Sequence, residues 1–396
     1  MQHGRHSTSG LPQPDEDSLA HCHKVSASIR EAIDESDGSI SFAQFMYLAL
    51  YSPGLGYYSA GTTKFGAAGD FVTAPEISPL FGRVVARQCK AVLKQTDNGQ
   101  ILELGAGSGK LAVDILRWLD DRNSLPDRYL ILEPSADLQA RQQDLIREEL
   151  PGLDGRIEWL SELPERLTGI VIANEVADAL PVERFERTDD AVFQMRVTAD
   201  ETGFDWSRRQ APDVLTTAVE KIEADIGDAL PGGYQSEVSL GLADWIAQLA
   251  ACLHKGLVLL FDYGVSRREY YSPDRNRGWL RCHFRHHAHN EPLIYAGIQD
   301  LTSWVDFTAV AQSAEEHGLD VQGFVTQADF LISGGLEDEL AGIAELPIAD
   351  QLELSRQVKL LTLPGEMGEH FKCIGLSRGK LSGEGAFSGA DRAHVL

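Results

Sequence analysis

Short apolar runs alternate with amphipathic segments along most of the chain, and this alternation predicts an α/β fold. The run at 169–174 is β-branched and apolar on both faces, as expected for a buried strand of a parallel sheet. Residues 111–119 have the apolar spacing of an amphipathic helix. The predicted strands are 101–104, 128–132, 157–160, 169–174 and 256–262, with 320–326 and 371–377 at the antiparallel edge of the sheet.

Helical patterns occur before the first predicted strand and between later ones. The spacing predicts a helix over 25–37, and Ser41 to Gln44 form a capping box that opens a short second helix. Ser78 followed by Pro79 predicts another helix start. Residues 331–360 are predicted to be helical and acidic. The polar stretch 186–240 is predicted to be an insertion of small strands and a helix.

A glycine-rich turn follows the first core strand, in the sequence QILELGAGSGKL at 100–111. Glycines let a backbone approach a ligand closely, and the next helix offers free amides there. A P-loop is excluded, because Leu104 replaces its first glycine and Leu111 its Ser or Thr. A dinucleotide fingerprint fails because the third glycine comes one residue early. The remaining pattern, E-x-G-x-G-x-G, is typical of S-adenosylmethionine (SAM) methyltransferases; a tight turn without a ligand is the alternative.

A second acidic residue supports the cofactor interpretation. Glu133 ends the next strand, 28 residues after Gly105. Nucleotide-binding α/β units place there the carboxylate that accepts the ribose hydroxyls. A surface glutamate at a strand end is the simpler alternative.

Composition narrows the class of partner. The formal charge of −25 repels nucleic acid and favours basic partners. Five scattered cysteines suit a reducing compartment, and no apolar run is long enough to span a membrane. The first residues resemble neither a signal peptide nor a transit helix. We therefore expect a cytoplasmic protein that binds neither nucleic acid nor membrane, with a disordered tail at 1–24 and a flexible one at 381–396.

Six motifs occur together and in order: GDFVTAPEISPLFG at 69–82, ILELGAGSGKL at 101–111, YLILEPSADL at 129–138, IANEVADALPVERF at 172–185, FDYG at 261–264 and CHFRHHAHNEPL at 282–293. Together they make the chain resemble the MidA-like SAM-dependent methyltransferases from about residue 40 to 378. This family includes the mitochondrial complex I assembly arginine methyltransferase. The resemblance implies a class I methyltransferase fold with a Rossmann-like seven-stranded sheet, and dimethylation of arginine in a protein.

The expected organisation follows from both lines of argument. A helical N-terminal and lid region at 25–98 precedes the first half of the core at 99–185. The insertion at 186–250 separates it from the second half at 251–380. The long loop 57–78 has the length of a binding loop or lid. The residues expected to bind SAM are Asp70, Glu76, Glu103, Gly105, Ala106, Gly107, Gly109, Glu133, Pro134, Asn174 and Glu175.

The predicted acceptor site centres on two acids past the fourth strand. A guanidinium stays protonated in water, and carboxylates can hold two of its nitrogens while the third reacts. Glu175 and Asp178 are therefore the first catalytic candidates; capping the next helix is their alternative role. Tyr57 and Tyr58 are candidate pocket walls, with aromatic packing as the simpler explanation.

The segment 282–289 is rich in Cys and His. Zinc sites usually draw on separated ligand pairs, so we expect no metal here. We expect a substrate-facing loop in which His283 or His286 orients an acid or serves as a base. The family has a small residue where this chain has Trp279, so contacts to the substrate can differ nearby.

The expected partner is a protein with a basic or arginine-bearing segment, and a homodimer is left open. Three alternatives remain at this point. The chain could bind SAM as a non-catalytic assembly factor, methylate a small molecule, or, less in keeping with its glycine spacing, be a nicotinamide-dependent oxidoreductase.

Overall fold

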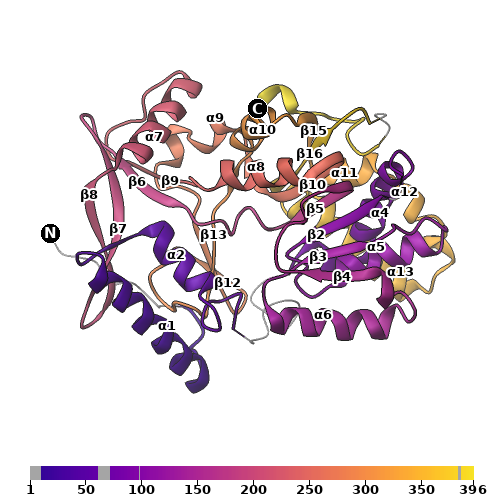
Figure 1. Ribbon diagram of the computed structural model, residues 1–396, viewed down its shortest axis with the longest axis horizontal. Coiled ribbons are helices and arrows are strands. Elements are labelled where there is room, and N and C mark those ends of the chain that lie inside the picture. The colour runs from indigo at the N-terminus through magenta and orange to yellow at the C-terminus, as the bar shows by residue number, and fades with distance from the viewer. Residues whose placement is uncertain (1–9, 61–71, 98, 382–384) are drawn as a thin grey trace. The chain divides into compact units, whose positions relative to one another are not determined.

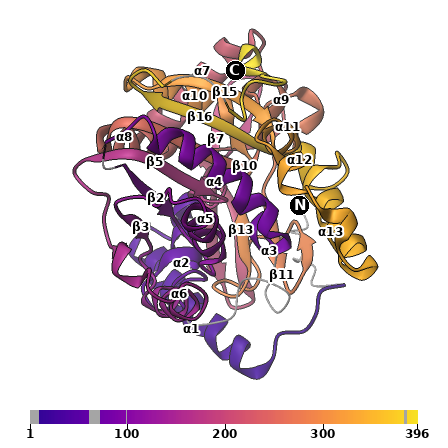
Figure 2. The same ribbon diagram turned by 90° about the vertical axis from the view of Figure 1, so that its right-hand side faces the viewer.

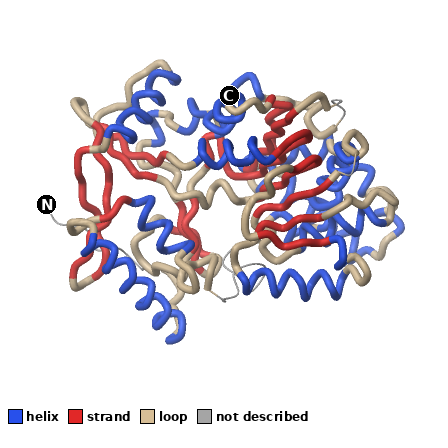
Figure 3. The backbone as a smooth tube through the Cα atoms, in the orientation of Figure 1, coloured by secondary structure: helices blue, strands red, loops and turns tan. Residues whose placement is uncertain are grey.

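Two units make up the computed structural model, which describes residues 10–60, 72–97, 99–381 and 385–396. The first unit consists of the described residues of Met1–Phe71 together with Asp178–Leu242 and Ser266–Trp304. The second consists of Val72–Ala177, Ala243–Val265 and Val305–Leu396. Many of the elements are labelled in Figure 1, and Figure 3 separates helices, strands and loops by colour.

The second unit is built on a mixed sheet with strand order β15-β16-β10-β5-β2-β3-β4, and β14 pairs with β10. All of these strands run parallel except β16, which is antiparallel to both of its neighbours. The predicted strands are therefore confirmed, but the antiparallel edge was only partly right, because β15 runs parallel to the core. The strands are β2 (Gln100–Leu104), β3 (Tyr129–Leu132), β4 (Ile157–Leu160), β5 (Leu167–Asn174), β10 (Leu253–Val265), β14 (Val305–Asp306), β15 (Asp320–Thr326) and β16 (Phe371–Arg378).

Two glycines let the central strands of this sheet come together. Gly169 in β5 has φ +139°, and a Cβ added there would lie 2.0 Å from the carbonyl oxygen of Gln100 in β2. Gly256 in β10 has φ +144°, and its Cβ would lie 1.8 Å from the carbonyl oxygen of Gly169. Neither position has room for a side chain. The pairing of β2, β5 and β10 near their N-terminal ends therefore depends on both glycines.

Helices cover this sheet, and α4 (Pro79–Leu93) illustrates why they form. Ser78 caps α4 by accepting from the Leu80 amide at 3.3 Å, and Pro79 occupies the first helical position, as predicted. Figure 2 shows α4 lying against the sheet. The other helices are α3 (Ala74–Ile77), α5 (Lys110–Asp120), α6 (Ala136–Glu149), α8 (Leu242–Cys252), α10 (Phe307–Glu316), α11 (Gln327–Ser333), α12 (Leu336–Glu339), α13 (Ile348–Thr362) and α14 (Met367–His370), with 3-10 turns η2 (Asp154–Arg156), η4 (Ile343–Glu345) and η5 (Ala393–Val395).

Two expectations for the C-terminal part need correction. The helical stretch 331–360 is broken into α11, α12, η4 and α13, because Gly335 and Gly342 adopt positive φ between them. Part of the supposed flexible tail 381–396 packs on the second unit: Ala386 is fully buried, the ring of Phe387 lies 5.9 Å from that of Phe330 in α11, and the Arg392 amide donates to the Phe324 carbonyl of β15 at 2.7 Å. A single aromatic in a polar, glycine-rich stretch gave no periodic signal for this packing.

The first unit has two smaller antiparallel sheets. One sheet has the order β1-β7-β6-β9, with β8 paired to β7, and the other has the order β12-β11-β13. The elements of the first unit are α1 (Glu16–Glu35), β1 (Ile40–Ser41), α2 (Phe42–Tyr51), β6 (Glu183–Arg187), β7 (Val192–Asp200), β8 (Gly203–Gln210), α7 (Asp213–Ile226), β9 (Tyr234–Val238), α9 (Arg267–Tyr270), η3 (Pro273–Arg275), β11 (Arg281–Phe284), β12 (His287–His289) and β13 (Asp300–Thr302). The strands β6 to β9 and the helix α7 are the small strands and the helix that were predicted for the insertion.

The helix α1 begins earlier than predicted. The expected tail at 1–24 is wrong from Glu16 onward, because Asp15 caps α1 by accepting from the Ser18 amide at 2.9 Å. Four apolar residues at helical spacing, Cys22, Val25, Ile29 and Ile33, are buried on one face. In α2 the predicted cap is confirmed, since Ser41 accepts from the Gln44 amide at 3.1 Å. Among the described residues, none of the helices has the length and apolarity needed to cross a membrane.

Replacing Gly169 by Ala tests the glycine contacts. Backbone strain and the clash with β2 together should cost more than about 3 kcal/mol, so that the thermal midpoint falls by roughly 6 °C or more. Gly203→Ala is the matched control, because Gly203 has φ +153° but nothing within 4 Å of its Cβ. Gly203→Ala should lower the free energy of unfolding only by the backbone strain, about 1–2 kcal/mol. Equal shifts for both variants in scanning calorimetry would contradict the close approach.

Candidate functional site

The glycine turn connects β2 to α5 and exposes backbone to a ligand. Gly105, Gly107 and Gly109 have φ values of +60°, +55° and +86°, which side-chain-bearing residues rarely adopt. Gly109 is the N-cap of α5 and supplies no side chain to the first amides of the helix. A Cβ on Gly105 would meet only Val176, at 3.4 Å, so the space beside the turn is open. The predicted strand-turn-helix is confirmed, and it places the first turn of a helix where an anionic or polar ligand group can bind.

A buried amide, Gln142, joins this turn to Glu133. Glu133 follows β3, is only 4% exposed, and accepts from the Ser135 amide at 3.0 Å. The Nε2 of Gln142 donates both to the other oxygen of Glu133, at 3.2 Å, and to the Gly107 carbonyl, at 3.0 Å. Trp159 in β4 donates to the Gln142 Oε1 at 2.9 Å. The carboxylate of Glu133 is therefore not a loose surface group; its position is fixed relative to the turn.

Glu103, the acid of the E-x-G-x-G-x-G pattern, is also buried. Its side chain accepts from the Tyr129 hydroxyl at 2.6 Å. Burial raises the pKa of Glu103 to about 7; the bond from Tyr129 opposes this shift, and the negative charge of Glu133 adds to it. Glu103 thus titrates near neutral pH.

The end of β5 brings Asn174 and Glu175 to the same edge of the sheet. Among the described residues, the buried Oδ1 of Asn174 has no hydrogen-bond partner, while its Nδ2 donates to Glu175 at 3.2 Å. Glu175 has φ +55°, and its amide donates to the Phe261 carbonyl of β10 at 2.9 Å. A strained acid beside an unsatisfied polar atom is typical of a binding site. The alternative of helix capping is excluded, because no helix begins in the described segment between Asn174 and β6.

Asp262, three residues before the end of β10, was recognised in the sequence only as the acid that closes the predicted strand. It is fully buried and accepts from the amides of Ala177 and Tyr263, each at 2.9 Å. Asp262 therefore fixes the segment that follows Glu175. This role could not be read from the sequence because Ala177 is 85 residues away.

Glu76 lies in α3, and its carboxylate accepts a short hydrogen bond from the hydroxyl of Ser108 in the glycine turn. The structure thus brings this predicted residue to the turn. Pro134, directly after Glu133, is exposed, and Ala106 is buried. Asp70 lies outside the described residues.

In the first unit, Asp178 and a second acid that the sequence analysis missed, Asp300, both lie near Tyr58. Asp178 and Asp300 are 4% and 2% exposed, and Tyr58 donates to Asp300 at 2.8 Å. Burial raises the pKa of Tyr58, and the charges of Asp300 and Asp178 raise it further. Tyr51 and Tyr58 stack at 5.5 Å between ring centroids. Asp300 went unnoticed because it starts β13, far in sequence from Tyr58.

The segment 282–289 is not the loop that was predicted. It forms the hairpin β11–β12, in which Arg285 and His286 adopt φ values of +47° and +63°, as a two-residue turn requires. His283 lies within β11, where burial lowers its pKa, while His286 is exposed at the turn. Within the part of the chain that the structure describes, no three His, Cys, Asp or Glu side chains gather in a way that could hold a metal.

Taken together, the carboxyl ends of β2, β3 and β5 place an open glycine turn, a fixed buried carboxylate and an unsatisfied amide oxygen at one edge of one sheet. Ligands of open α/β sheets bind at this edge. The donor set fits a ligand with ribose hydroxyls and a polar tail, so SAM is compatible with it.

Comparison with known proteins gives the same result. Residues 82–325 match a family described as S-adenosyl-L-methionine-dependent methyltransferases. A crystal structure from Burkholderia thailandensis, bound to S-adenosyl-homocysteine, is 36% identical to this chain, covers 98% of it and 100% of its own chain, and has a TM-score of 0.91.

Curated relatives are more distant. The "Protein arginine methyltransferase NDUFAF7 homolog, mitochondrial" of Drosophila melanogaster is 28% identical over 88% of this chain and 83% of its own length. The NDUFAF7 protein of Xenopus laevis is 27% identical over 85% and 81%. The prediction of a cytoplasmic protein is wrong by this comparison, because these relatives are named as mitochondrial.

A pH series tests the burial of Glu103. Its pKa of about 7 in the folded protein exceeds the ordinary value of 4.5, so the folded state binds the proton more tightly. The stability this contributes is full below pH 4.5 and is lost as the pH rises through 7. Between pH 4.5 and 8, the free energy of unfolding measured by urea titration should fall by roughly 3 kcal/mol more for wild type than for Glu103→Gln. Parallel pH profiles for the two proteins would show that Glu103 is not buried as described.

The family match spans more than half of the chain, and the cofactor-bound relative covers nearly all of it. Both agree with the polar groups found at the edge of the sheet. The chain belongs to the family of S-adenosyl-L-methionine-dependent methyltransferases, and SAM is its cofactor.

Proposed function

We propose that the protein transfers a methyl group from SAM to an arginine side chain of a protein partner. The observation that carries the arginine specificity is the name shared by the curated relatives, protein arginine methyltransferase. The buried acids described above support it. Under this proposal the sheet is that of a class I methyltransferase. Residues 61–71 of the loop predicted as a lid lie outside the described residues.

The cofactor-binding roles follow from the geometry of the second unit. Glu133 accepts hydrogen bonds from the ribose hydroxyls, and the backbone from Gly105 to Gly109 lies against the amino-acid part of the ligand. The unsatisfied Oδ1 of Asn174 accepts from a donor of SAM. Ala106 and Pro134 line the site, and Glu103 and Glu76 fix its shape. When bound, SAM would supply a methyl group attached to a positively charged sulfur. The rest of the cofactor is a good leaving group because it departs as a neutral thioether.

The acceptor guanidinium must become more nucleophilic on one nitrogen. Glu175 and Asp178 bind two of its nitrogens and draw positive charge toward them, leaving the third electron-rich. The positive φ of Glu175 fixes the direction of its side chain. His283, whose pKa is lowered by burial, is neutral at physiological pH and takes the proton that the reaction releases. His286, exposed at the hairpin turn, contacts the partner.

Charge sets the class of partner. A chain with a formal charge of −25 attracts a basic segment over long range and repels nucleic acid. An arginine in a basic, exposed segment of a protein is therefore the proposed acceptor.

Binding of S-adenosyl-homocysteine tests the role of Glu133. Loss of a charge-assisted contact to the ribose should cost about 1–3 kcal/mol, so Glu133→Ala should bind roughly 5- to 150-fold more weakly in calorimetric titrations. Glu158→Ala, an exposed acid on the neighbouring strand β4, is the matched control and should bind like wild type. Equal affinities for the two variants would remove Glu133 from the site.

Transfer of labelled methyl tests the reaction itself. Lysate of a strain that lacks this protein is incubated with labelled SAM and the purified chain, and each labelled band is hydrolysed for amino-acid analysis. Dimethylarginine in a single band is expected. Asp178→Asn should lower the rate at least 100-fold, because the guanidinium loses its countercharge, while binding of S-adenosyl-homocysteine stays within twofold. Label only in small molecules, or none despite cofactor binding, would overturn the proposal.

A further inference from the structure

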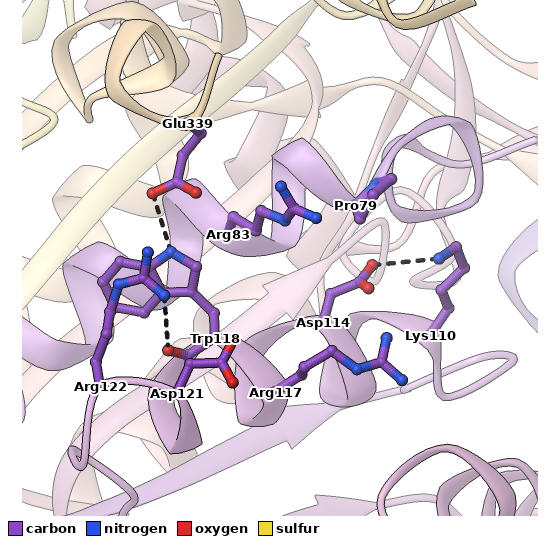
Figure 4. A pocket seen from close by; sticks show the side chains of 9 residues that line it. All are labelled: Pro79, Arg83, Lys110, Asp114, Arg117, Trp118, Asp121, Arg122 and Glu339. Atoms are coloured by element: carbon purple, nitrogen blue, oxygen red, sulfur yellow. Dashed lines mark hydrogen bonds and ion pairs between the residues drawn. The ribbon is translucent and has the colours of Figure 1, made fainter. Parts of the chain in front are cut away.

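A charged cavity of about 340 Å³ lies in the second unit, between α4, α5 and α12 (Figure 4). One face of α5 forms its floor, with Lys110, Asp114, Arg117 and Trp118 at helical spacing. Arg83 enters from α4, and Glu339 closes it from α12. The methyl-transfer proposal uses none of these side chains.

Three cations surround one buried carboxylate in this cavity. Asp114 is 4% exposed, and the Lys110 Nζ lies 3.3 Å from its Oδ2. Arg117 and Arg83 also lie near enough to act on the charge of Asp114. Figure 4 shows their guanidinium groups on either side of it. The number of positive charges therefore exceeds what Asp114 balances.

Of the other acids nearby, Asp121 also lines the cavity, while Glu149 and Glu339 each accept from side chains. Glu149, outside the cavity, binds Arg117, but only through Nη2. Glu339 accepts from the Trp118 indole at 2.9 Å and from Arg87 at 3.4 Å. Arg83 makes no hydrogen bond or ion pair within the described part of the chain. Arg83 therefore has no bound carboxylate among the described residues, although the chain as a whole carries a formal charge of −25.

The backbone fixes Arg83 in this place. The preceding residue, Gly82, lets α4 and α5 come so close that a Cβ there would lie 2.5 Å from the Cβ of Asp114. The backbone of Arg83 is thereby placed next to α5, while the Arg83 residue is exposed to solvent.

We propose that this cavity binds a small phosphorylated molecule, with the phosphoryl group held by Arg83, Arg117 and Lys110. Arginine forks match phosphate oxygens in paired hydrogen bonds, and lysine adds a point charge. The volume of 340 Å³ is within the range of small-molecule sites and exceeds what a single inorganic ion fills. The cavity is lined by none of the residues 105–109, although Lys110 directly follows that turn, and the proposal does not depend on the methyl acceptor.

Calorimetric titration with inorganic pyrophosphate tests this site on the full-length protein at low salt. One pyrophosphate should bind per chain, and added salt should weaken binding. Arg83→Gln and, as a second variant, Arg117→Gln should each weaken it at least tenfold. Arg147→Gln on α6 removes the same charge from a side chain that is 67% exposed, and should bind like wild type. Saturating S-adenosyl-homocysteine should leave pyrophosphate bound.

Three results would overturn the proposal. The first is the absence of saturable binding to wild type. The second is equal affinity in Arg83→Gln and Arg147→Gln, which would indicate non-specific attraction. The third is displacement of pyrophosphate by S-adenosyl-homocysteine, which would place it in the cofactor site. Circular dichroism of each variant verifies that its fold is intact.

Discussion

The position of Glu133, the carboxylate proposed to bind the cofactor, depends on one buried amide. Gln142 is fully buried and has each of its polar atoms paired, through Gly107, Glu133 and Trp159. It thus links three segments that follow or form adjacent strands: the glycine turn after β2, the end of β3, and β4. A buried polar network of this kind holds a single geometry because breaking any bond leaves an unsatisfied group. The site is therefore shaped before SAM arrives, which is the condition for tight binding.

Sheet order explains why the functional residues meet. Parallel strands β2, β3 and β5 end at one edge, where Gly105, Glu133 and Glu175 follow them, and the neighbouring strand β10 carries Asp262 near the same edge. The close packing at Gly169 and Gly256 sets the opposite ends of the same strands. Glu175, held at positive φ between Asn174 and the β10 carbonyl, is strained backbone at the point where the acceptor is proposed to bind.

Local patterns predicted the local features well. The strands Ile157–Leu160 and Asp320–Thr326 were predicted to the residue, and the caps at Ser41 and Ser78 were correct, because each depends on a few adjacent side chains. The glycine turn and Glu133 were found by spacing alone. Their assigned roles in binding SAM stay predictions.

Long-range contacts could not be predicted in this way. Gln142 reads as one more polar residue of a helix, and only the fold brings it to Gly107, 35 residues away. Asp300 and Asp262 were passed over for the same reason. The start of α1 was missed because a polar, histidine-rich sequence hides its buried stripe. The hairpin at Cys282 was missed because Arg285 and His286 are not the usual turn residues.

A crystal structure of the protein with S-adenosyl-homocysteine tests the central claim most directly. The account predicts both ribose hydroxyls within hydrogen-bond distance of the Glu133 carboxylate, a ligand donor on the Oδ1 of Asn174, and the bonds of Gln142 unchanged. A ligand whose ribose lies away from Glu133, or a Gln142 side chain that turns out of its network on binding, would contradict it.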